Sequence, residues 1–289
     1  MTEISQRGSG SVISLRRYPV KSMTGEKLTE TVLSQRGLLG DRAYALVETL
    51  TGNVASGKNP RKWSRLLSCR SEFIDPPRSV ETIPTVRITL PDGQTVASDQ
   101  EEVHDVLSRF LGHQVQLTAA PPPAPNLEIC LTGLEGIAPK DTVLDIAMGK
   151  GAPGGTFFDF GVVHIITTAS LAQLQEHYPA GCFDERRFRP NIVVESAPGE
   201  TGFVENEWIG HTVAVGDEVR LQVFEPTGRC VMTTLAQGDL PHDPGILRTA
   251  ADYHRVHVAA LDKDLPSVGV YANVLNGGTI RTGDRVSVE

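Results

Sequence analysis

Short segments of alternating apolar and polar residues occupy most of the first 120 residues, and this period of two predicts β-strands. We expect strands at residues 12–18, 27–34 and 42–48, and a hairpin in which residues 86–90 and 94–96 flank a Pro-Asp-Gly turn. A helical period appears at residues 101–111, where apolar side chains recur before a glycine: Val103, Val106, Leu107, Phe110 and then Gly112. The N-terminal part is therefore predicted to be a small β-rich unit with one helix.

Strand patterns also dominate the C-terminal half of the chain. Residues 162–168 form a β-branched run that predicts a strand, and residues 170–177 follow as a helix with Ser170 as its expected N-cap. The Gly-Asp pairs at 216–217 and 283–284 predict tight turns. The remaining predicted strands lie in five segments: 191–196, 212–226, 256–262, 269–275 and 279–289. The predicted fold class is mainly β, or α+β, with few short helices.

Two stretches interrupt these patterns. Residues 120–125 read Ala-Pro-Pro-Pro-Ala-Pro, a stiff, extended sequence that is either an interdomain linker or a surface crossing. Residues 148–155 are rich in glycine and predict a loose segment. A chain of 289 residues is long for one hydrophobic core, so two domains are expected.

Composition narrows the class of protein. The formal net charge is −8, from 27 Lys and Arg against 35 Asp and Glu, which argues against a nucleic-acid binder that works through bulk charge. No apolar run approaches the ~20 residues of a membrane helix, and the first ten residues lack the apolar centre of a signal peptide. We therefore expect a cytoplasmic protein with no membrane segment.

The four cysteines are candidates for chemistry, but their spacing excludes common metal motifs. Cys69, Cys130, Cys182 and Cys230 lie roughly 50 residues apart, far wider than the two to four residues between paired zinc ligands. Cys230 follows a predicted strand and a Pro-Thr-Gly turn, and the neighbouring Arg229 is expected to lower its pKa. A thiolate there would suit a soft metal or nucleophilic chemistry; the alternative is one more buried apolar side chain.

Basic residues gather at three places in this acidic chain. Arg186, Arg187 and Arg189 precede Asn191 at the start of a predicted strand, and arginine forks match phosphate oxygens. The alternative is a solvated loop paired with its acidic neighbours. Two further anion cradles are expected in loops that contain Lys21 with Ser22 and Asp41 with Arg42. The phosphate-loop, HExxH and GxSxG motifs are all missing from the sequence.

Taken together and in order, these motifs resemble those of MOSC-domain proteins, in particular the family of the mitochondrial amidoxime-reducing component. The matching segments are YPVKS at 18–22, GDR at 40–42, TTASL at 167–171, RFRPNIVV at 187–194, WIG at 208–210, GRC at 228–230 and GTIRTGD at 278–284. The resemblance implies a smaller N-terminal β-barrel-like domain over residues 12–120 and a MOSC β-barrel domain over residues 121–289.

The resemblance also implies a cofactor, the molybdenum–molybdopterin group. By that resemblance the Cys230 thiolate is the metal ligand and the catalytic residue. The implied cofactor-binding residues are Lys21, Ser22, Arg42, Arg189, Asn191 and Arg229. Two features depart from the family pattern: Gly228 stands where relatives often have a small polar residue, and residues 148–155 have no counterpart that we can place.

The implied activity is the two-electron reduction of small N-hydroxylated compounds, such as hydroxylamines, amidoximes and N-oxides. With no cysteine after Cys230, electrons are expected from a separate donor, a ferredoxin or a cytochrome b5-like protein with its reductase. Asp184 and Glu205 are candidates for proton delivery. Two alternatives remain open: a sulfur carrier that holds a persulfide on Cys230, and a cofactor-binding or storage module without turnover.

Overall fold

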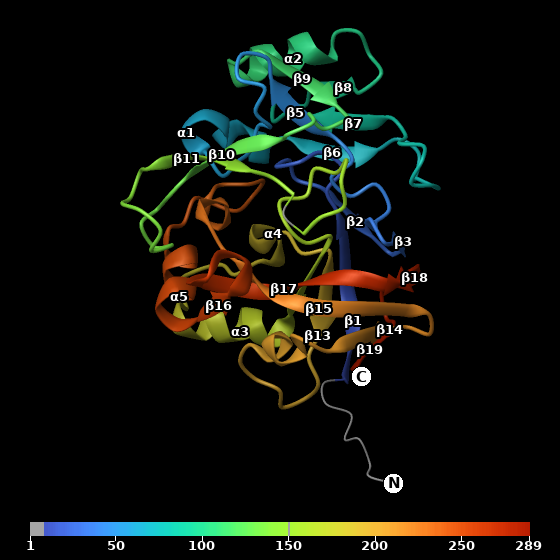
Figure 1. The fold of residues 1–289 in the computed structure, drawn as a ribbon, viewed down its shortest axis with the longest axis vertical. Helices are drawn as coiled ribbons and strands as arrows, with labels where there is room; N and C mark the ends of the chain where they lie inside the picture. Colours follow the sequence, from blue (N-terminus) through green and yellow to red (C-terminus); the bar gives the residue numbers. More distant parts are fainter. Residues whose placement is uncertain (1–8, 150) are drawn as a thin grey trace.

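Seven strands of the computed structural model, which describes residues 9–149 and 151–289, close into a barrel (Figure 1). In order around the barrel they are β12 (Val163–Thr167), β13 (Ile192–Glu195), β1 (Ser9–Arg17), β19 (Arg285–Val288), β14 (Thr212–Val215), β15 (Val219–Gly228) and β17 (Lys263–Asn276), which pairs again with β12. Closure leaves these strands without open edges, because every one has a partner on both sides. The prediction of a mainly β fold with few short helices is confirmed.

The first strand of the chain is part of this barrel. β1 pairs with β13 on one side, where Leu15 lies opposite Ile192, and with β19 on the other. It also pairs with the short β2 (Glu26–Leu28). A three-stranded sheet beside the barrel again joins the two ends of the sequence: β18 (Gly278–Arg281), β3 (Glu30–Ser34) and β4 (Gly37–Leu38). After β1 the chain thus leaves the barrel and later returns to it; the division at residues 120 and 121 stays a proposal.

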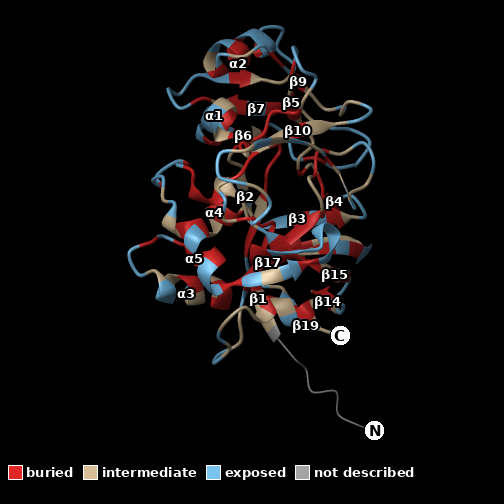
Figure 2. Ribbon diagram, turned by 60° about the vertical axis from the view of Figure 1, so that its left-hand side comes forward, coloured by how far each residue is buried: buried red, intermediate tan, exposed pale blue. Residues whose placement is uncertain are grey.

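The barrel interior is filled by β-branched and leucine side chains that alternate with outward-facing residues. Leu15, Ile165, Val223, Val270 and Val286 are each at most 1% exposed and belong to one cluster. Figure 2 shows this buried interior and a second buried region in the upper part of the molecule. Burial of apolar surface on this scale is the main term that holds the strands together.

The second buried region belongs to the segment between β4 and residue 118. Its core contains Trp63, Leu66, Ile88 and Leu107, all at most 2% exposed. Helix α2 ends at Gly112, whose φ of 76° closes the helix in the left-handed conformation, as predicted. Its elements are β5 (Ala45–Glu48), α1 (Pro60–Trp63), the 3₁₀ helix η1 (Ser64–Ser68), β6 (Arg70–Phe73), β7 (Val86–Thr89), β8 (Thr95–Ala97), α2 (Val103–Leu111) and β9 (Val115–Thr118).

The hairpin of β10 (Asn126–Cys130) and β11 (Val143–Ala147), which sequence patterns did not predict, lies between this region and the barrel (Figure 1). The remaining helices pack against the barrel. They are α3 (Thr168–His177), α4 (Glu185–Phe188), α5 (Gly245–Tyr253) and the 3₁₀ helices η2 (Val204–Trp208), η3 (Val231–Thr234) and η4 (Ala259–Leu261), and one further strand, β16 (Arg255–Val258), pairs with β17.

Three local predictions need correction. The N-cap of α3 is Thr167, whose hydroxyl accepts a hydrogen bond from the Ser170 amide; Ser170 is wrong as a cap because its own hydroxyl turns inward to Glu205. The strand expected at 27–34 is two strands, because Thr29 departs to accept a hydrogen bond from the Thr282 amide. The strand expected at 256–262 ends at Val258, where the 3₁₀ helix η4 follows. The helix α5 was not predicted at all. In the glycine-rich segment at 148–155, Lys150 lies outside the described residues, as do the first eight residues of the chain.

Candidate functional site

A polar cavity opens where the barrel meets the N-terminal region, and all seven predicted site residues line it. These are Lys21, Ser22, Arg42, Arg189, Asn191, Arg229 and Cys230. They come from loops after β1 and β4, from the segment between α4 and β13, and from the end of β15, so only the tertiary fold unites them. Their roles as ligands and binding groups stay predictions.

Three of these residues hold a backbone conformation that non-glycine residues rarely adopt. The φ angles of Ser22, Arg42 and Arg189 are 63°, 48° and 57°. A left-handed conformation costs an L-residue about 1–3 kcal/mol, and such strain concentrates at functional sites. The surrounding contacts therefore impose the direction in which these three side chains enter the cavity.

The aromatic ring of Tyr18 organises two of the arginines. The guanidinium carbons of Arg42 and Arg189 lie 4.6 Å and 4.2 Å from its ring centroid. Burial raises the pKa of Tyr18 to about 12, and its hydroxyl donates to the Pro190 carbonyl at 3.2 Å. Burial also lowers the pKa of Arg189 to about 10, because this cation lacks the solvation of a surface arginine.

Asn191 is held by the protein on both ends of its side chain. Its oxygen accepts from the His164 amide at 3.1 Å, and its Nδ2 donates to the Asp41 carboxylate at 2.9 Å. Asp41 in turn pairs with Arg42. Asn191 therefore fixes the position of Asp41 and Arg42 at the cavity wall.

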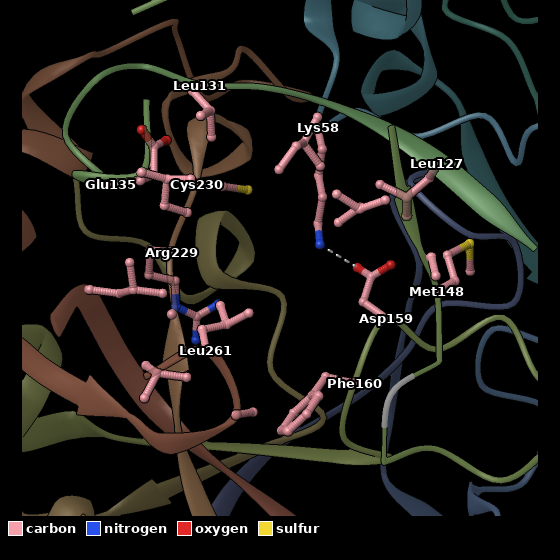
Figure 3. A pocket seen from close by; sticks show the side chains of 18 of the residues that line it. Lys58, Leu127, Leu131, Glu135, Met148, Asp159, Phe160, Arg229, Cys230 and Leu261 are labelled. Carbon is pink, nitrogen blue, oxygen red and sulfur yellow. Dashed lines mark ion pairs between the residues drawn. The ribbon is translucent and has the colours of Figure 1, made fainter. Parts of the chain in front are cut away.

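An ion pair network that the sequence analysis missed crosses the cavity. The Asp159 carboxylate contacts Lys21 Nζ at 2.5 Å and Lys58 Nζ at 2.9 Å. Figure 3 shows the second of these two ion pairs. Although burial opposes it, the two ammonium groups hold the pKa of Asp159 well below its usual range. Burial lowers the pKa of Lys21 to about 8, whereas the pKa of Lys58 is raised because the Asp159 carboxylate outweighs its own burial.

Arg229 points away from the sulfur of its neighbour. Its guanidinium donates to the carbonyls of Phe188, at 2.9 Å, and Val268, and it contacts the ring of His164. Burial and the Arg229 charge lower the pKa of His164 well below its ordinary value, so this histidine is neutral. Burial lowers the pKa of Arg229 itself to about 10.

Cys230 lies at the end of β15, where the chain enters η3, and its side chain is half-buried. Its sulfur points into the same space as the Lys58 side chain (Figure 3). Burial raises the pKa of the thiol, and the cation that opposes this shift is Lys58. The expectation of a lowered thiol pKa is therefore wrong, because burial outweighs the nearby positive charge. The Arg229 guanidinium is held by backbone carbonyls, and Lys58 comes from the other region of the fold.

The predicted arginine cluster divides into three environments. Arg186 faces outward and pairs with Asp184 at 2.8 Å, as the alternative interpretation of a paired loop expected. Arg187 is buried and donates to three backbone carbonyls, while Arg189 reaches the cavity. Asp184 and Glu205, the candidate proton donors, do not line the cavity.

A second, apolar cavity adjoins the polar one, and Cys230 lines both. Lys58, Asp159, Gly228, Arg229 and Tyr271 are likewise shared. The sequence analysis did not single out Lys58, Asp159 or Tyr271. Hydrophobic periodicity predicts helices and strands, but it does not indicate which side chains from distant segments meet in a cavity. The one local sign was the Phe-Phe-Asp-Phe-Gly sequence at 157–161, where a lone acid sits among aromatic residues.

The polar cavity fits an anionic, phosphate-bearing cofactor with a soft metal. Six cationic side chains line it, Lys21, Arg42, Lys58, Arg187, Arg189 and Arg229, against the single acid Asp159. The depressed pKa values of Lys21, Arg189 and Arg229 come first from burial, a cost that a bound anion relieves. The thiol of Cys230 supplies a soft donor at the same place. Across residues 9–149 and 151–289, no group of three His, Cys, Asp or Glu side chains is arranged to hold a metal ion alone.

Comparisons with known proteins agree with this architecture. Residues 9–114 match the MOSC N-terminal beta barrel domain, and residues 156–287 match the MOSC domain. The chain is 25% identical to mitochondrial amidoxime-reducing component 1 of Mus musculus, over 96% of this chain and 82% of that protein. The helices of the described part of the chain include none of the length and apolar character that crossing a membrane requires.

Similarity to solved structures is weaker. The YuaD protein of Bacillus subtilis aligns over 97% of this chain and 95% of its own, with 11% identity and a TM-score of 0.44. YiiM from Geobacillus stearothermophilus aligns over 45% of this chain and 54% of its own, with 20% identity and a TM-score of 0.30. Neither TM-score reaches 0.5, so the assignment follows from the two domain matches, which together span most of the chain. The chain belongs to the MOSC-domain family, with a MOSC N-terminal β-barrel domain ahead of the MOSC domain.

Proposed function

We propose that the protein binds the molybdenum–molybdopterin cofactor in the polar cavity and reduces small N-hydroxylated compounds. The observation that carries the proposal is the convergence of a half-buried thiol, Cys230, and a surplus of desolvated cations on one cavity. The similarity to a protein named for amidoxime reduction supports the same activity. A thiol alone would serve a sulfur carrier equally well, but a sulfur carrier has no need of the cationic lining.

The predicted cofactor-binding side chains have different roles, according to whether their polar atoms are free or already bound to the protein. Arg42, Arg189 and Lys21 would hold the phosphate, since guanidinium and ammonium groups are the usual partners of phosphate oxygens. The Ser22 hydroxyl accepts from the Gly57 amide at 3.1 Å and keeps its own proton to donate. Asn191 and Arg229 act by position, because their polar atoms are already engaged with the protein.

The bound cofactor would supply the two-electron removal of an oxygen atom, and the balance is R–NHOH + 2e⁻ + 2H⁺ → R–NH₂ + H₂O. The protein's part is to hold the Cys230 sulfur at the boundary of the two cavities, with polar groups behind it and an apolar space in front. Electrons would come from a separate donor, a ferredoxin or a cytochrome b5-like protein with its reductase.

The test is the molybdenum content of protein purified from a host that makes the cofactor. We expect near one molybdenum per chain in the wild type and in Cys182→Ala, which removes an exposed thiol outside both cavities. Cys230→Ala should lose most of the metal, because the soft ligand is gone. The wild-type protein should then reduce benzamidoxime with an artificial electron donor, and Cys230→Ala should not.

Three results would contradict the proposal. Molybdenum that stays at wild-type level in Cys230→Ala would remove the thiol from the metal site. Metal-free wild-type protein that carries cyanide-labile sulfur on Cys230 would favour the sulfur carrier instead. Metal bound through Cys230 with no reduction of any N-hydroxylated compound would leave the binding or storage module.

A further inference from the structure

The β10–β11 hairpin forms one wall of the apolar cavity beside Cys230. It lies between residue 114 and residue 156, the limits of the two domain matches. Its larger apolar side chains in the cavity are Leu127, Ile129, Leu131, Ile137 and Ile146, and Met148 follows directly after β11. A segment outside both matched domains therefore shapes the space in front of the thiol.

The register of the hairpin separates an apolar face from a polar face. Leu127 lies opposite Ile146, and Ile129 lies opposite Leu144, so these side chains share one face of the two strands. Leu127, Ile129 and Ile146 pack toward a cluster that includes Phe157. The next pair along the strands, Glu128 opposite Asp145, faces the other way.

Hydrogen bonds and an ion pair connect the hairpin to neighbouring segments and hold this wall of the cavity in position. The Cys130 amide donates to the Lys58 carbonyl at 2.8 Å, beside the lysine whose ammonium enters the cavity. On the polar face, Asn59 Nδ2 donates to Glu128 at 3.1 Å, and Arg61 pairs with Asp141 at 2.8 Å. Near the hairpin tip, Arg255 donates to the Leu134 carbonyl and so connects the hairpin to β16.

The opposite wall is apolar as well. It comes from the β16–η4–β17 segment and consists of Val258, Leu261 and Leu265. The charged groups that line the cavity are already satisfied: Lys58 pairs with Asp159, Arg229 is bound to carbonyls, and Glu135 accepts from Thr132 at 2.9 Å. A polar substrate body placed here would lose its water without gaining partners.

We propose that the hairpin at residues 126–147 is a specificity element that selects N-hydroxylated substrates with an apolar aryl or alkyl body. This inference rests on the proposed function and deepens it. The N-hydroxyl group lies at the Cys230 end of the cavity, and the hydrocarbon body packs between Ile146 on the hairpin and Leu261 on the opposite wall. Apolar contact of this kind discriminates between substrates by about tenfold or more for each well-packed side chain.

The experiment compares benzamidoxime with acetamidoxime, which carry the same reacting group on a large and a small apolar body. We expect the wild-type enzyme to favour benzamidoxime by at least about tenfold in kcat/KM. Ile146→Trp fills the cavity and should reduce this preference about tenfold. The matched control is Val143→Trp, on the same strand at a side chain that is 42% exposed and does not line the cavity.

A second pair of variants covers the case in which Ile146→Trp fails to fold. Leu261 is 51% exposed and lines the cavity, and Leu275 is 55% exposed and does not. Leu261→Gln should weaken the preference for benzamidoxime, and Leu275→Gln should leave it unchanged. Two results would overturn the inference. One is an equal kcat/KM for benzamidoxime and acetamidoxime in the wild type. The other is a ratio of the two kcat/KM values that neither Ile146→Trp nor Leu261→Gln changes.

Binding to the metal-free protein separates this inference from the proposed function. Calorimetric titration should give tighter binding of benzamidoxime than of acetamidoxime, and Leu261→Gln should reduce the difference. If neither compound is reduced but this binding difference is present, the reductase activity fails while the apolar site stands. If both compounds are reduced equally and bind equally, the activity stands and the specificity element fails.

Discussion

At the scale of single residues, the charges around Asp159 govern how the polar cavity attracts an anion. Its carboxylate lies within 2.9 Å of two ammonium groups and is the single acid among the described residues that line this cavity. It partly satisfies Lys21 and Lys58 in the protein without a ligand. An anion that binds beside these lysines meets both their attraction and the repulsion of Asp159.

We therefore predict opposite effects of two substitutions on anion affinity. Asp159→Asn removes the repulsion and should tighten the binding of inorganic phosphate by about fivefold, or ~1 kcal/mol. Lys21→Met removes an attraction and should weaken it by a similar factor. Calorimetric titration with phosphate at low ionic strength measures both, and the exposed Asp217→Asn serves as the control. Equal affinities in all four proteins would show that the anion does not bind among these lysines.

At the scale of elements, Glu205 joins η2 to the start of α3. It is fully buried, and its carboxylate accepts from the hydroxyls of Thr167 at 2.6 Å and Ser170 at 2.6 Å. Burial raises its pKa, against the opposing hydrogen bonds from those hydroxyls. The Glu205 carboxyl thus holds the N-terminus of α3 in place, although burial disfavours its charged form.

This arrangement predicts how stability depends on pH. A raised pKa in the folded state means that the folded protein binds more protons than the unfolded chain between the two pKa values. The free energy of unfolding should therefore fall, by at most about 1.4 kcal/mol per pH unit, as pH rises from the ordinary glutamate pKa through the raised one. Glu205→Gln should lack this loss. Urea unfolding at pH 5 and pH 8 checks it, and a difference between the two proteins that is the same at both pH values would contradict it.

At the scale of the whole molecule, the barrel depends on the first strand of the chain. β1 lies between β13 and β19, although some 175 to 270 residues separate it from them in sequence. Without β1, both neighbours would present unpaired backbone groups and the apolar interior would open to water.

We predict that a fragment of residues 121–289 does not fold by itself, even though it contains the other six barrel strands. The full chain should unfold in one cooperative step by near-ultraviolet circular dichroism, and the fragment should show no such transition. Restoring residues 9–17 through a flexible linker to the fragment should recover part of the barrel signal. Cooperative unfolding of the bare fragment would contradict the role assigned to β1.

Particular residues show which parts of the fold and of the candidate site can be predicted from the sequence. Helix α2 and its end at Gly112 follow from helical spacing and the need for a left-handed residue, both local properties. The hairpin at β7 and β8 follows from its Pro-Asp-Gly turn in the same way. The residues Lys21, Arg42, Arg189 and Cys230 were located by residue chemistry together with the order of motifs, and all four line the polar cavity.

Residue patterns and the order of motifs were therefore enough for most of the local structure, for family membership and for seven residues that line the polar cavity. Tertiary structure decided the rest. It brought Lys58 into the cavities that the Cys230 thiol lines, and it set Asp159 between two lysines. It also brought the β10–β11 hairpin over the thiol and β1 into the barrel. The physical reason is that the pKa of a group and the shape of a cavity depend on burial and on neighbours distant in sequence, which periodicity along the chain does not record.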